Sequence, residues 1–183
     1  MDKAALVSAI DSVHADWLSQ VDGLGIEGLE RAGAVGDWRV RDILAHANCW
    51  DRWQLVQLRC AFTGETPTDR ELQGEIDFPP NDDMHEDAMN AMFLAGYVDW
   101  STDDVVRHFR EVFAMRTAWV GDASQAQLDA TVGADWTGGT NRVIRLSSEV
   151  EGVDNPQPAW QFILNQVEHL RSHLDNVRRS PDS

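Results

Sequence analysis

Apolar residues recur at helical spacing in four long stretches of this sequence, and this periodicity limits the folds open to the chain. In residues 3–21, five apolar side chains follow one another at intervals of three or four residues. That interval places side chains on one face of an α-helix. Residues 38–62, 101–120 and 158–179 show the same pattern. We therefore expect an all-α fold, a four-helix bundle in which each apolar face is buried in a shared core.

The expected core faces can be read from these intervals. They comprise Leu6, Ile10, Val13, Trp17 and Val21 on the first helix; Val40, Ile43, Leu44, Ala47 and Leu58 on the second; and Val105, Val106, Phe109, Val112, Phe113 and Val120 on the third. We expect Asp37 to cap the second helix and Ser101 the third, because their side-chain oxygens can accept bonds from free amides of a first turn. The last helix is expected to begin near Pro158.

The connections are rich in residues that interrupt helices. Five glycines in "DGLGIEGLERAGAVGD" are expected to end the first helix. A long acidic loop and a short helix over residues 86–97 are expected between the second and third helices. The brief alternation in "RVIRL" favours a small hairpin before the last helix. We expect one domain over residues 1–179, followed by a frayed tail at 180–183.

The charge balance restricts the partners. The chain has 31 acidic and 15 basic residues, a net charge of −16. Nucleic acids and anionic membranes are polyanions, so we expect neither as a partner and expect a small-molecule substrate instead. No apolar run approaches the roughly 20 residues of a membrane span, and the first residues do not resemble a signal peptide, so we expect a cytoplasmic protein. A monomer and a homodimer both remain open.

The two cysteines are expected to be free thiols. Cys49 and Cys60 are eleven residues apart. On one helix their Cα atoms would lie about 16 Å apart, which is too far for a disulfide. Buried, unreactive thiols are the simpler interpretation.

Three histidines suggest a metal site. His169 and His173 lie one helical turn apart on the apolar side of the last helix, and His46 lies on the tryptophan-rich second helix. Imidazoles in this arrangement can bind one divalent ion, with Zn²⁺, Ni²⁺ and Fe²⁺ as candidates. The alternative is that each histidine is a core residue that bonds a polar neighbour. His85 and His108 are expected to face solvent.

Other polar residues fall inside apolar helix faces. Asp51 and Arg116 are expected to form a buried pair or, alternatively, to act in function: Asp51 as a hydrogen-bond acceptor that orients a metal ligand or as a general base, and Arg116 as a binder of an anionic substrate group. Trp50 and Trp53 are core residues or the wall of a substrate pocket. Gln166 shares the helix face of His169, beside this expected pocket.

Several motifs together resemble one superfamily. "GDWRVRDILAHANCWDRW" and "FILNQVEHLRSHLDNV" are similar to the second and last helices of DinB/YfiT-like proteins, and "HEDAMNAMFLAGYVDWSTDDVVRHFREVFA" resembles the ClbS/DfsB type. The resemblance implies an up-down-down-up bundle, a metal site at the three histidines, and a role for Asn90 in ordering the pocket rim. The chain departs from the pattern at Arg39, where the superfamily has Ser or Thr, and in the loop after Val120.

The resemblance also implies a function. We expect a metal-dependent enzyme that acts on a small electrophile by hydrolysis or by thiol S-transfer with a low-molecular-weight thiol cosubstrate, in detoxification or self-resistance. The alternative is a non-catalytic protein that sequesters a small molecule without a metal. A unit that serves mainly for dimerisation is a third possibility.

Overall fold

The protein is largely α-helical. The computed structural model describes residues 1–78, 86–135, 143–148 and 154–179, which form seven helices and two small antiparallel sheets. The elements, in chain order, are α1 (Lys3–Leu29), β1 (Ala32–Val35), β2 (Trp38–Arg39), α2 (Val40–Thr63), α3 (Asp69–Gln73), α4 (Glu86–Gly96), α5 (Thr102–Asp122), α6 (Gln125–Asp129), β3 (Thr131–Asp135), β4 (Val143–Leu146), β5 (Asp154–Pro158) and α7 (Ala159–Arg179). The expected tail at 180–183 lies outside the described residues.

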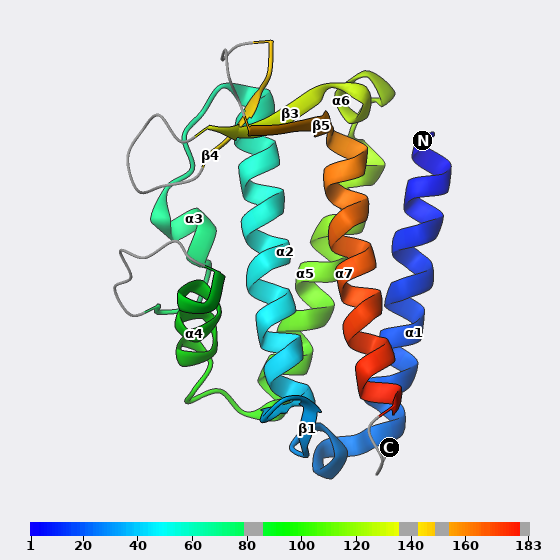
Figure 1. Ribbon diagram of the computed structural model, residues 1–183, viewed down its shortest axis with the longest axis vertical. Helices are drawn as coiled ribbons and strands as arrows, with labels where there is room; N and C mark the ends of the chain where they lie inside the picture. Colours follow the sequence, from blue (N-terminus) through cyan, green and yellow to red (C-terminus); the bar gives the residue numbers. More distant parts are fainter. Residues whose placement is uncertain (79–85, 136–142, 149–153, 180–183) are drawn as a thin grey trace.

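Four long helices lie side by side along the length of the molecule (Figure 1). Helices α1 and α7 run in one direction, and α2 and α5 run in the other. Two parallel neighbours such as α2 and α5 need a connection that returns along the molecule, and α4 lies on the outer side of α2 within that connection (Figure 1). The three-stranded sheet and α6 lie at one end of the long helices, and the β1–β2 hairpin lies at the other.

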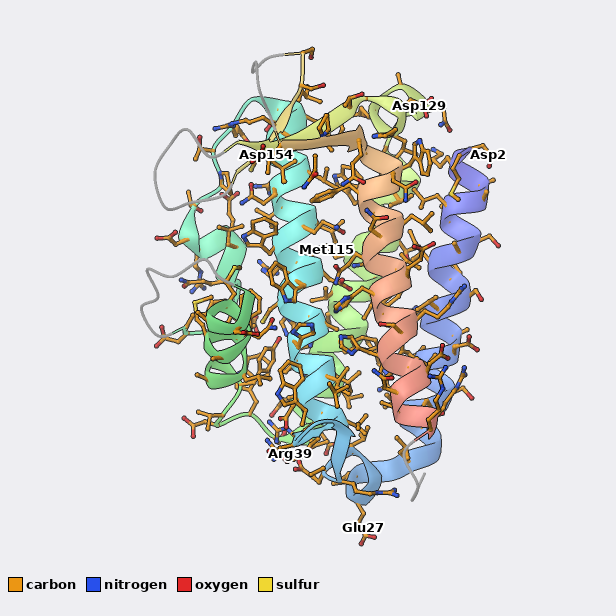
Figure 2. All side chains as sticks on the ribbon, viewed as in Figure 1. Asp2, Glu27, Arg39, Met115, Asp129 and Asp154 are labelled. Carbon is orange, nitrogen blue, oxygen red and sulfur yellow. The ribbon has the colours of Figure 1, made fainter. Side chains whose placement is uncertain are left out.

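The apolar faces of the long helices meet in one core, as the periodicity predicts. All sixteen core residues named from the sequence are buried, and side chains fill the space between the helices (Figure 2). Trp17 is fully buried, and its indole N–H donates to the carbonyl of Leu170 over 3.1 Å, which ties α1 to α7. Burial of the apolar faces supplies most of the stability of such helices.

The ends of the long helices differ partly from expectation. Ser101 caps α5 as predicted, because its side chain accepts a bond from the amide of Asp104. The prediction of Asp37 as the cap of α2 is wrong, because the N-cap residue is Arg39. The Asp42 carboxylate accepts bonds from the backbone N–H and the guanidinium of Arg39, so Asp42 satisfies this end of the helix. Asp37 lies in the turn between β1 and β2.

The first helix continues beyond its expected end. Residues 22–29 remain helical except at Gly25, where the backbone has φ 61° and ψ −177°. Residues with a side chain rarely adopt this backbone conformation, so glycine permits a kink there without ending the helix. The β1–β2 hairpin that follows was not predicted, because its strands are too short to show an alternating pattern.

The hairpin expected from "RVIRL" is present, since β4 pairs antiparallel with β3. The third strand, β5, was not predicted, because its sequence "DNPQP" contains two prolines and no alternation. The Gln57 side chain accepts a bond from the Ile144 amide over 3.1 Å and so attaches this sheet to α2. Within residues 1–78, 86–135, 143–148 and 154–179, no helix is both long enough and apolar enough to span a bilayer.

Candidate metal centre

Three histidine side chains from two helices converge at one point between α2 and α7. The Nε2 atom of His169 lies 3.2 Å from Nε2 of His46 and 2.8 Å from Nε2 of His173. One ring nitrogen from each of the three residues lies within 4.8 Å of the other two. The structure therefore brings together the three residues that the sequence indicated as metal ligands.

These separations fit three ligands of one ion. Two nitrogens each 2.0–2.1 Å from a zinc ion lie about 3.4 Å apart at the tetrahedral angle and about 2.9 Å apart at a right angle. The 2.8 and 3.2 Å separations around His169 are close to this range. Three imidazoles leave at least one coordination position for water or a substrate, as in catalytic metal sites.

The protein environment keeps two of the imidazoles neutral. Burial, together with smaller contributions from the neighbouring charges of His173 and His169, lowers the pKa of His46 to about 3. Burial also lowers the pKa of His173 to about 4, with a smaller contribution from His169. Only a neutral imidazole has a lone pair for a metal, so both side chains are in the ligating form at pH 7.

The other ring nitrogens of His46 and His173 are buried. The Nδ1 atoms of His46 and His173 have no hydrogen-bond partner among the described residues. In many metal sites this nitrogen bonds a carboxylate or a carbonyl. Here the His46 ring is instead surrounded by aromatic rings, with centroids 5.2 Å away for Trp38 and 6.4 Å away for Trp50. The sequence did not assign Trp38 to the site, because it precedes the helix and is outside its periodicity.

Asn90 connects α4 to this site. Its side-chain oxygen accepts a 2.9 Å bond from the indole N–H of Trp50. The Asn90 side chain also raises the pKa of His46, against the larger effect of burial. Asn90 therefore holds the aromatic wall beside the histidines.

A cavity of about 280 Å³ opens beside His169. The sequence indicated Trp50, Trp53 and Gln166 as pocket residues, and all three line this cavity. Its walls also include Gln54 and Phe162, which were not assigned to a pocket. Helical spacing could have indicated both as pocket residues, because Gln54 follows Trp50 by one helical turn and Phe162 precedes Gln166 by one turn. Trp53 is 8% exposed, so it belongs to the core and to the cavity wall at once.

Asp51 and Arg116 form a buried ion pair between α2 and α5. Their side chains are 1% and 0% exposed. Burial raises the pKa of Asp51, while the charge of Arg116 and a hydrogen bond with Gln166 lower it. With no exposed surface, Arg116 has no access to an anionic substrate, so the structural alternative describes it better than the catalytic one. Gln166, which lines the cavity, lies beside this pair.

Neither His108 nor either cysteine belongs to the three-histidine cluster. The prediction that His108 faces solvent is wrong, since it is 5% exposed and bonds the Tyr97 hydroxyl over 2.6 Å. It covers the hydroxyl end of a buried tyrosine, which needs a polar partner. His85 lies outside the described residues. Cys49 and Cys60 are buried free thiols, as expected, and burial raises the pKa of Cys49, which makes its thiol less reactive.

Comparison with known proteins yields a similarity of fold. No family model matches the sequence, and no curated protein matches it. The crystal structure of a protein from Streptococcus pneumoniae is similar, with a TM-score of 0.67 over 98% of this chain and 90% of that one. The two sequences are 12% identical, so the similarity concerns the fold alone.

Proposed function

We propose that this protein is a metal-dependent enzyme of the DinB/YfiT type, built on an up-down-down-up four-helix bundle. The observation that carries the proposal is the convergence of the three Nε2 atoms of His46, His169 and His173 beside a cavity. Imidazole ligands suit Zn²⁺, Ni²⁺ and Fe²⁺. A bound ion would lower the pKa of water or of a thiol cosubstrate and so supply a nucleophile at neutral pH.

The chain's own residues bind and orient the substrate. Aromatic rings of Trp50, Trp53 and Phe162 line the cavity and would hold a small flat molecule against His169. Their apolar surfaces also limit the water around the reacting group. Hydrolysis of a small electrophile, or its transfer to a low-molecular-weight thiol, fits a nucleophile beside such a cavity, and detoxification or self-resistance in the cytoplasm is the role we propose.

The first test is metal content. Protein purified without an affinity tag is analysed by elemental mass spectrometry, before and after incubation with Zn²⁺, Ni²⁺ or Fe²⁺. We expect about one ion per chain, lost in His169→Ala and His46→Ala. His14→Ala is the matched control, because His14 is a half-buried histidine that stacks on Phe113, outside the cluster. A wild-type protein that binds no metal, or a His169→Ala variant that retains it, would contradict the proposal.

A second candidate function is supported by the cavity itself. The aromatic walls can hold a small molecule without a metal, because Trp50, Trp53 and Phe162 need no ion to contact it. In that case the protein sequesters its ligand without turnover. Ligand binding that saturates and does not change with a chelator, in a protein without metal, would favour this function over the first.

A further inference from the structure

A second cavity, of about 460 Å³, is lined by residues of α2, of α3 and the turn after it, and of α5. It shares no lining residue with the cavity beside His169. Its walls combine charges of both signs with an apolar strip, and they comprise Arg52, Arg70, Glu71, Gly74, Glu75, His108, Glu111, Val112 and Met115. A cavity of this size with a few convergent polar groups is typical of a small-molecule site.

Arg52 is held at the wall of this cavity by two contacts. Its Nε atom donates to the carbonyl of Glu71 over 3.1 Å. Its guanidinium lies against the backbone of Gly74, where φ is 67° and an added Cβ would be 2.6 Å from the Arg52 Cζ atom. The Glu71 carboxylate pairs with Arg59, and no carboxylate of the described residues pairs with Arg52. The Nη edge of Arg52 is therefore available to a ligand carboxylate, which a guanidinium binds through two hydrogen bonds.

His108 supplies a donor to the same cavity. Burial raises the pKa of Tyr97 and lowers the pKa of His108, so both side chains are neutral at pH 7. The His108 Nδ1 atom is the only oxygen or nitrogen acceptor that the described residues offer the Tyr97 hydroxyl, 2.6 Å away. The hydroxyl therefore donates to Nδ1, and the ring proton of His108 is on Nε2. No described residue bonds this Nε2–H, although His108 is only 5% exposed and lines the cavity.

Two carboxylates of the cavity are available to a cation. Glu75 is exposed, and no described residue forms an ion pair with it. Glu111 is 54% exposed and pairs on the surface with Arg107, an interaction that is weak in water. Both carboxylates raise the pKa of His108, whereas the charge of Arg52 lowers it. Groups of both signs therefore act on the same imidazole ring, and a ligand beside this ring meets both.

We infer that this cavity is a second binding site, for a small zwitterion of the amino-acid class. The ligand carboxylate binds the guanidinium of Arg52 and the Nε2–H of His108. The ligand ammonium group faces Glu75 and Glu111, and its aliphatic part lies on the apolar strip of the wall. The inference does not depend on the proposed function, because the two cavities are lined by different residues.

Three probes that differ in one charged group each test this inference. L-Norleucine is the zwitterion, hexanoate lacks its amine, and pentylamine lacks its carboxylate. Each is titrated into chelator-treated protein, so that no metal at the three histidines binds the probe, and binding is followed by the NMR signals of the Gly74 and Val112 amides. We expect norleucine to bind at least about tenfold more tightly than either of the others, because each missing group removes charge-assisted hydrogen bonds.

Variants assign the effect to the two charged walls. Arg52→Met is expected to weaken norleucine and hexanoate at least about tenfold and to leave pentylamine unchanged. Arg171→Met, in an exposed arginine of α7, is the matched control and should bind like wild type.

The double variant Glu75→Gln/Glu111→Gln changes only exposed side chains, so it tests the inference even if Arg52→Met does not fold. It should reduce the affinity for norleucine to that for hexanoate. No binding of norleucine, equal binding of norleucine and hexanoate by the wild type, or norleucine binding unchanged in folded Arg52→Met or in the double variant would overturn the inference.

Discussion

The buried ion pair of Asp51 and Arg116 permits a quantitative prediction about stability. Arg116→Met removes the guanidinium but preserves most of the side-chain volume. It leaves the Asp51 carboxylate 1% exposed and without its counter-charge. Removing one partner of a buried pair costs about 3–5 kcal/mol, because the remaining charge cannot return to water. In a domain of this length, each kcal/mol lowers the melting temperature by about 2–4 °C.

The assay is urea unfolding followed by circular dichroism at pH 8 and pH 5. A buried carboxyl without a counter-charge binds a proton more readily, so the loss in Arg116→Met should be smaller at pH 5. In the double variant Asp51→Leu/Arg116→Met no buried charge remains. It should therefore recover most of the stability that the single variant loses.

The control is the same substitution in an exposed pair. Arg107 and Glu111 are bridged over 3.0 Å on the surface of α5, and their side chains are 51% and 54% exposed. Arg107→Met should cost less than about 1 kcal/mol. The reasoning is refuted if Arg116→Met costs no more than Arg107→Met, or if the double variant is as unstable as the sum of its single variants.

Three further predictions concern pH, backbone conformation and capping. Because the pKa of His46 falls to about 3 and that of His173 to about 4 on folding, the metal-free protein should lose stability as the pH falls below about 6.5 toward these values. The loss at pH 5 should be about 2 kcal/mol for each histidine, and urea unfolding of His173→Phe should show a weaker pH dependence than wild type. Gly25→Ala should lower the free energy of unfolding by about 1–3 kcal/mol, because Gly25 has φ 61°. In the same helix, Gly23→Ala should raise it by about 0.5–1 kcal/mol, because an added Cβ there meets no atom within 4 Å. Thermal melts that show no difference between the two variants would contradict this. Ser101→Ala should cost about 1 kcal/mol through loss of the cap of α5, and an unchanged unfolding midpoint would count against that role.

The helices and their buried faces were predictable because they depend on local spacing. A residue such as Trp17 is buried because the positions three and four residues away are also apolar, and that relation is visible along the chain. The cap of α5 was predictable for the same reason, since Ser101 bonds an amide only three residues away. Short strands such as β5 were not predictable, because hydrogen bonds to β3 and not its own residues define it as a strand.

The candidate site likewise has one part that could be predicted from the sequence and one part that could not. The sequence placed His169 and His173 one turn apart on a single helix face, because helical geometry alone determines that relation. It indicated His46 as the third ligand through antiparallel packing and a family resemblance. Only the tertiary structure brings the Nε2 atom of His46 to 3.2 Å from that of His169, because this distance depends on how α2 packs against α7.

The sequence by itself determined which residues the core would bury and which side chains could act as ligands, because periodicity and residue chemistry are local properties. The tertiary structure decided which polar groups are paired and which are free. Arg116 is oriented toward Asp51 instead of a substrate, and the Gln54 amide nitrogen donates to the Phe162 carbonyl on α7. Such choices depend on contacts between helices distant in the chain, and a buried polar group is directed by the partner that packing places beside it.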